Sequence, residues 1–138
     1  MEARERYLRI ALIVVGIAFL LIYPLMKIWP SGWVWLPRQP EYELMIVGVY
    51  ATLGIFLLLA SRNPSAHTSL IGFTVWSSVV HGLIMAVQAL LDPTESGHFL
   101  GDIPALLLAA IALGVLAPRE TVPDAGTSAV ETPAISSR

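Results

Sequence analysis

The chain has 138 residues, of which 56% are apolar and only 13% carry a charge, and its formal net charge is −2. A soluble domain carries about twice that fraction of charged residues, so this composition indicates a membrane protein. A nearly neutral chain gives no sign of nucleic-acid binding or of docking to an anionic surface. Because cysteine is absent, disulfides, thiolate metal sites and cysteine catalysis are excluded.

Four hydrophobic segments, separated by loops that contain proline, predict an all-α, four-helix bundle that spans the membrane four times. We expect these helices over about residues 8–28, 43–61, 68–91 and 99–117. Together they form one transmembrane domain, residues 1–117. The segment 118–138 is rich in Ser, Thr, Pro and Ala, which predicts a disordered cytoplasmic tail.

The first hydrophobic segment has a basic start, as a signal peptide does. Its apolar run is longer than a signal core, and no small-x-small cleavage site follows it, so we interpret it as a retained helix. The basic residues then predict the orientation. One side of a four-span bundle holds Arg4, Arg6, Arg9, Arg62 and Arg119, and the other side holds Lys27 and Arg38. Since positive residues favour the cytoplasm, we expect both termini inside.

The third segment carries a stripe of polar side chains. Steps of three or four residues return to the same face of a helix. The stripe consists of Thr74, Ser77, Ser78, His81, Gln88 and Asp92. In a membrane helix such a face must lie against other helices or along a wet cavity. We therefore expect a small polar pocket inside the bundle, on this face.

His81 lies near the middle of the third segment, where an ionisable side chain is by default a candidate for function. The simpler interpretation is a neutral imidazole that joins two helices by a hydrogen bond. Haem ligation needs two histidines at similar depth, and His67 and His98 are expected at opposite ends of the helices. Only a dimer that pairs two copies of His81 would supply them. The sequence therefore predicts neither a cofactor nor a metal ion.

Acidic residues and a histidine gather at the outer ends of the predicted helices. They are Glu41, Glu43, Asp92, Glu95, His98 and Asp102. Such ligands suit a divalent cation, but acids at helix starts also complement the helix dipole, which is the interpretation we favour. We expect His98 and Asp102 to pair along one helix face, because they are four residues apart. Asp102 should then turn towards Gln88. The full set of pocket candidates is Glu43, Tyr50, Ser77, Ser78, His81, Gln88, Asp92, His98 and Asp102.

The first outer loop is rich in aromatic residues. It holds Trp29, Trp33 and Trp35, with Tyr23 and Tyr42 beside it. Such rings favour the level of the lipid headgroups, which predicts an interfacial belt. The alternative is a lid over a lipid-like ligand, since prolines restrict this loop.

Three stretches together carry a resemblance to a known family: FLLLASRNP at 56–64, WSSVVHG at 76–82 and GHFLGDIP at 97–104. They resemble a family of small bacterial four-helix membrane proteins that is catalogued only as a domain of unknown function. The resemblance covers roughly residues 7–117 and implies a multi-pass protein of the bacterial inner membrane. It implies no activity, substrate or cofactor. In size and helix count the chain also looks like the DoxX-like group of membrane proteins, a likeness of fold alone.

The favoured function is non-enzymatic: an integral membrane protein whose pocket binds a lipid-like or quinone-like molecule, or a partner's helix. The alternative is a membrane redox or acid/base enzyme component that uses His81, with Asp102 or Asp92 as proton relay. A transporter subunit would need oligomerisation, because four short helices enclose little pore. The expected partners are membrane lipid, a small apolar ligand and a second copy of the chain, and no nucleic acid.

Overall fold

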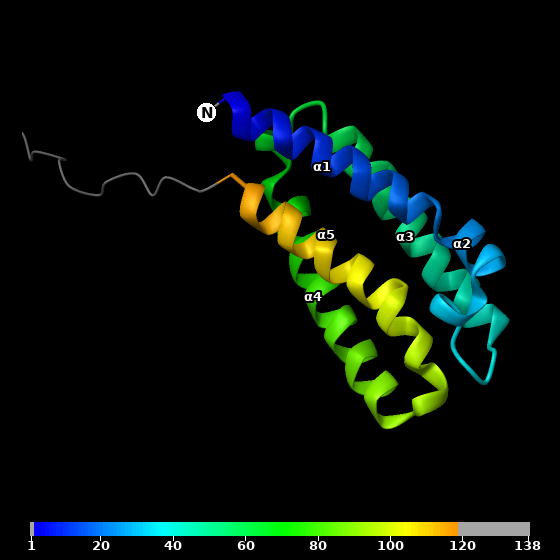
Figure 1. The fold of residues 1–138 in the computed structure, drawn as a ribbon. Coiled ribbons are helices and arrows are strands. Elements are labelled where there is room, and N and C mark those ends of the chain that lie inside the picture. The colour runs from blue at the N-terminus through cyan, green and yellow to red at the C-terminus, as the bar shows by residue number, and fades with distance from the viewer. Residues whose placement is uncertain (1, 119–138) are drawn as a thin grey trace, which may run out of the picture.

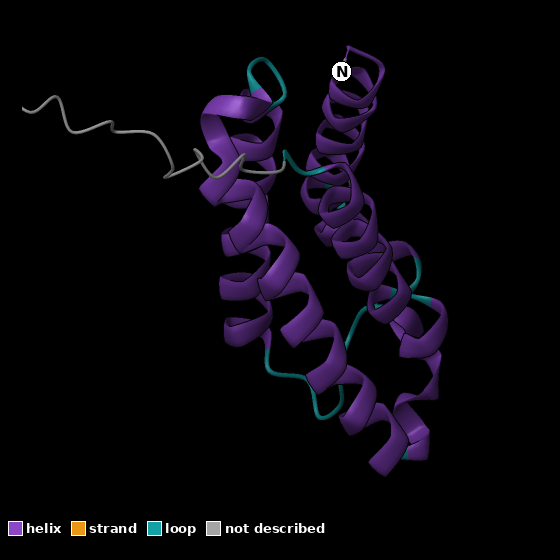
Figure 2. Cartoon of the chain, turned by 90° about the vertical axis from the view of Figure 1, so that its left-hand side faces the viewer, coloured by secondary structure: helices purple, strands orange, loops and turns teal. Residues whose placement is uncertain are grey.

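The computed structural model describes residues 2–118, and every regular element in that range is a helix (Figure 2). In chain order these are α1 (Glu2–Leu20), α2 (Ile22–Ile28), η1 (Pro30–Gly32), α3 (Pro40–Ala60), η2 (Pro64–His67), α4 (Thr68–Leu91), η3 (Pro93–Leu100) and α5 (Asp102–Leu116). The prediction of an all-α protein is confirmed. The predicted tail, from residue 119 onward, lies outside the described residues.

Three helical stretches are long and apolar enough to cross a membrane: Pro40–Ala60, Pro64–Leu91 and Pro93–Leu116. The bent pair α1–α2 makes a fourth if it is counted as one span. Large apolar side chains lie exposed around the outside of the bundle, such as those of Trp76 and Leu91. Such a surface suits a lipid environment and would be a liability in water.

The helices form two pairs that diverge. α1 packs along α3 and α4 packs along α5, and Figure 1 shows the two pairs close together at the N-terminus and apart at α2. At the narrow end, the guanidinium of Arg4 donates hydrogen bonds to the carbonyl oxygens of Val115 and Ala117, at 3.0 and 2.6 Å. The start of α1 and the end of α5 therefore lie at this narrow end, and the opposite end is the wide end.

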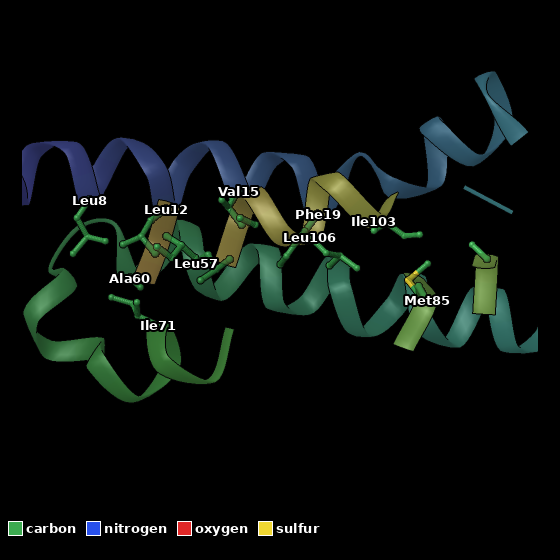
Figure 3. Packing of buried hydrophobic residues seen from close by; sticks show 13 residues of the cluster. Leu8, Leu12, Val15, Phe19, Leu57, Ala60, Ile71, Met85, Ile103 and Leu106 are labelled. Atoms are coloured by element: carbon green, nitrogen blue, oxygen red, sulfur yellow. The ribbon is translucent and has the colours of Figure 1, made fainter. Parts of the chain in front are cut away.

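Apolar side chains fill the narrow end of the bundle. The most deeply buried are Leu8, Leu12, Leu57, Ile71 and Leu113, each at most 2% exposed. Figure 3 shows the first four of these gathered around the turn from α3 to α4. Towards the wide end the core continues through Phe19, Met85 and Leu106, which border the cavity described below.

The helices α1 and α3 cross in backbone contact at two glycines. A Cβ atom added to Gly54 would lie 2.7 Å from the carbonyl oxygen of Gly16, and one added to Gly16 would lie 2.9 Å from that of Gly54. Both distances are too short for a real Cβ contact. Small residues at such crossings let membrane helices approach closely. This crossing fixes the distance between the helices that form one wall of the cavity.

The first predicted helix, 8–28, is two helices in the structure. The chain bends by 52° between α1 and α2. Pro24 explains the break, because its ring has no N–H and clashes with the carbonyl four residues earlier inside a helix. In the structure Pro24 instead lies in the first turn of α2, where no N–H is needed.

The fourth predicted helix, 99–117, begins later than expected. Residues up to Leu100 belong to the 3₁₀ helix η3, and α5 starts at Asp102 after a turn at Gly101. His98 and Asp102 therefore lie on two different helices that meet at Gly101. The third predicted helix, 68–91, has the same bounds as α4 (Thr68–Leu91).

Candidate functional site

A cavity of about 650 Å³ lies between the two helix pairs. The long helices α1, α3, α4 and α5 supply its walls, together with α2 and the loop of residues 29–39. Most of the lining side chains are apolar. Five of the sequence candidates also line it: Glu43, Tyr50, His81, Gln88 and Asp102. A cleft of this size, with a few polar groups on apolar walls, suits a small ligand.

A hydrogen bond between Tyr50 and His81 joins the two helix pairs at the cavity. The hydroxyl oxygen of Tyr50, on α3, lies 2.8 Å from Nδ1 of His81, on α4. Phe19 of α1 packs edge-on against the ring of Tyr50, with 4.9 Å between the centroids. If the hydroxyl donates to Nδ1, the imidazole carries its own proton on Nε2. A ligand in the cavity could then accept a hydrogen bond from that nitrogen.

The imidazole of His98 lies fully buried between two carboxylates. Its Nδ1 is 2.9 Å from both carboxylate oxygens of Asp102, and its Nε2 is 3.2 Å from Oε2 of Glu95. We call Glu95, His98 and Asp102 the triad. Of its members only Asp102 lines the cavity. Any effect of the other two on a ligand must therefore act through Asp102.

The loop of residues 29–39 is fixed onto the triad. The ring of Trp35 stacks on the imidazole of His98, with 4.1 Å between the centroids. The backbone N–H of Leu36 donates to Oε1 of Glu95 at 2.8 Å. A Cβ atom on Gly101 would overlap the carbonyl oxygen of Gly32. The loop therefore lies in backbone contact with the turn between η3 and α5.

The sequence favoured an interfacial belt for the tryptophans of this loop, and their level in a membrane stays a prediction. Trp33 and Trp35 turn inward and line the cavity. Trp29 is 41% exposed and remains outside it. This placement suits the alternative, in which the loop covers a ligand.

Glu43 is the second carboxylate on the cavity wall. It lies in the first turn of α3, where an acid complements the helix dipole. Its Oε2 is 3.4 Å from the guanidinium of Arg38, whose side chain is 55% exposed. No lysine or arginine is found among the described residues that line the cavity.

The remaining candidates lie away from the cavity. The hydroxyl of Ser77 donates to the carbonyl of Thr74 at 3.3 Å, and Ser78 is buried without a hydrogen-bond partner for its Oγ among the described residues. Asp92 caps η3 at an exposed position. The hydroxyl and the backbone N–H of Thr94 donate to this carboxylate and lower the pKa of Asp92 below its usual value.

The polar stripe of α4 is one face whose surroundings change along the helix. Towards the narrow end Thr74 and Ser78 are buried, because the helix pairs lie close together there. Further along, His81 and Gln88 line the cavity, because the pairs have diverged. Asp92 lies beyond the last residue of α4. The spacing of residues predicts the face, but the divergence of the helices decides which part of it meets the cavity.

Several residues of this site were not among the pocket candidates, Glu95, Trp33 and Trp35 among them. Glu95 appeared in the sequence only as one of several outer acids, and the tryptophans as part of an aromatic belt or, in the alternative, of a lid. The spacing of three residues from Glu95 to His98 could have suggested the contact. Nothing in the sequence indicates that Trp35 would stack on His98. Within residues 2–118 no group of three or more His, Asp or Glu side chains is arranged to hold a metal ion.

Comparison with known proteins gives a family and no activity. Residues 3–132 match a family of unknown function, DUF6632. The searches of curated proteins and of solved structures found no match. The match covers nearly the whole chain, so the protein belongs to the DUF6632 family, as the resemblance of its sequence implied.

Proposed function

We propose that this is a multi-pass membrane protein that binds one small amphipathic molecule, lipid-like or quinone-like, in the cavity at the wide end. One observation carries the proposal: the four long helices and α2 supply apolar walls to a space of about 650 Å³ that a few polar side chains also line. The same chain packs tightly at the narrow end. The opening therefore follows from the divergence of the helices and not from a general lack of large side chains.

We further propose that α1–α2 is one span, that both termini are cytoplasmic and that the membrane is the bacterial inner membrane. The contact of Arg4 with the end of α5 supports the first two points, because it holds both ends of the described chain on one side. More basic residues flank that side than the other. The cavity then opens towards the periplasmic half of the membrane.

A second candidate function is a redox or acid/base component. The buried triad and the pair of Tyr50 with His81 favour it, because hydrogen-bonded ionisable groups inside a membrane protein often carry protons. The absorbance spectrum of the purified protein separates the two functions. A Soret band would show a bound haem, which the sequence did not predict, and would favour the redox component.

Native mass spectrometry of the purified protein, with identification of bound lipids, tests the main proposal and reports the oligomeric state. The variant Ala105→Phe places a ring into the cavity from α5, and Leu83→Phe places one on the exposed face of α4 as the control. The first should lose the bound molecule and the second should keep it. Retention by both variants, or no bound molecule in the wild type, would contradict the proposal.

A further inference from the structure

The wall of the cavity near the loop of residues 29–39 is both acidic and aromatic. The side chains of Glu43 and Asp102 line the cavity together with four aromatic residues, Trp33, Trp35, Tyr42 and Tyr50. A cation is attracted to the face of an aromatic ring, and the attraction grows when water is excluded. Carboxylates and rings around an apolar space are therefore the surroundings that an organic cation requires.

The acidic side chains at and behind this wall outnumber the basic side chains that contact them. One imidazole, that of His98, lies between the carboxylates of Glu95 and Asp102, so when both carboxylates are ionised it offsets at most one of the two negative charges. Arg38 contacts Glu43 at 3.4 Å from an exposed position and does not line the cavity. An unbalanced buried carboxylate is costly. A positive charge in the cavity would remove that cost.

We infer that the molecule bound in the cavity is a lipophilic organic cation, held with its charge against Asp102 and the tryptophan rings and its apolar part along α1 and α5. This inference rests on the proposed function and adds the charge of the ligand to it. The carboxylates would repel a phosphate, so the headgroup of a phospholipid does not fit. A neutral quinone would bring no positive charge to offset the negative charge of the carboxylates.

Two compounds of similar shape test the charge. Tetraphenylphosphonium is a permanent aromatic cation, and tetraphenylsilane is its neutral counterpart, with the same four rings around one central atom. Binding is followed by tryptophan fluorescence in neutral detergent. The exposed residues Trp29 and Trp76 are replaced by phenylalanine, so that Trp33 and Trp35 report. We expect the cation to bind about tenfold more tightly than the neutral compound, about the gain from a cation–π contact from which water is excluded.

The variant Asp102→Asn keeps the size of the side chain and removes its charge. It should weaken binding of the cation by about tenfold, through the lost attraction between opposite charges, and leave binding of the neutral compound nearly unchanged. The control is Asp92→Asn, which removes an acid that does not line the cavity. Circular dichroism and the melting temperature establish that each variant folds. If Asp102→Asn does not fold, Glu43→Gln takes its place, with the same expected direction.

The outcomes separate this inference from the proposed function. If both compounds bind equally and Ala105→Phe abolishes binding of both, the cavity is a binding site and the proposed function stands. The inference that its ligand is a cation is then refuted. Binding of the cation that Asp102→Asn leaves unchanged also refutes it. Competition by dodecyl phosphate, which has a phosphate headgroup and no positive charge, would show a phosphate headgroup site instead. If neither compound binds and the purified protein carries no other molecule, both proposals fail.

Discussion

Replacing Gly54 by alanine should destabilise the protein by pushing α1 and α3 apart. The new Cβ atom would lie 2.7 Å from the carbonyl oxygen of Gly16 and 3.3 Å from atoms of Phe19 and Leu20. The carbonyl belongs to helical backbone, so it cannot rotate away as a flexible side chain could. Overpacking of this kind costs about 1–3 kcal/mol, and alanine regains about 0.5–1 kcal/mol in helix stability. We expect a net loss of roughly 1–2 kcal/mol.

Gly48, on the same helix, provides the matched control. A Cβ atom there would meet nothing within 4 Å. The variant Gly48→Ala should therefore gain roughly 0.5–1 kcal/mol, because alanine restricts the unfolded chain more than glycine does. The two substitutions are chemically identical and six positions apart, and only their contacts give them opposite signs.

Unfolding of both variants can be followed by far-UV circular dichroism during titration of mixed micelles with sodium dodecyl sulfate. Tyr50 lies one turn before Gly54, so separating α1 from α3 should also shift its hydrogen bond to His81. If Gly54→Ala proves as stable as Gly48→Ala, the close crossing of α1 and α3 does not exist in the membrane protein.

His81→Leu should cost about 1 kcal/mol, and a double-mutant cycle with Tyr50→Phe should assign most of that cost to their shared hydrogen bond; additive effects would refute the contact. Glu95→Ala, which removes the acceptor of the Leu36 N–H, should cost about 1–3 kcal/mol and shift the tryptophan emission to longer wavelength, because Trp35 loses its fixed position over His98. An unchanged spectrum would mean that Glu95 does not hold Trp35 in position. A reporter active only in the periplasm, fused after Pro118, should give no signal; a strong signal would reverse the proposed orientation.

The positions of the helices could be predicted because a segment in lipid must satisfy its own backbone hydrogen bonds. A long apolar run between prolines can therefore hardly form anything but a helix in lipid, and α4 is an example. The bend between α1 and α2 could not be predicted in the same way. Pro24 interrupts the helix, but its effect on direction depends on where α2 packs against α3 and η1. Hydropathy carries no information about those contacts.

Part of the candidate site could be predicted because a polar residue stands out in an apolar helix. His81 and Gln88 are of this kind. Glu95 and Trp35 lie instead in connecting segments, where polar and aromatic residues are common. Their positions follow from tertiary contacts, above all the approach of Gly32 to Gly101, which places the loop on η3. Only the folded chain shows that these residues share one site.

The placement of the buried ionisable groups supports a role in binding. Glu95 and His98 are at most 4% exposed, and enclosing such groups costs stability unless they are paired. For holding helices together, apolar side chains would serve at least as well, as Leu12 and Leu57 do at the narrow end. The triad instead lies behind the cavity, at the wide end, and reaches it through one carboxylate. A purely structural triad would have no need of that access, so Asp102 is the residue at which the proposed function is best tested.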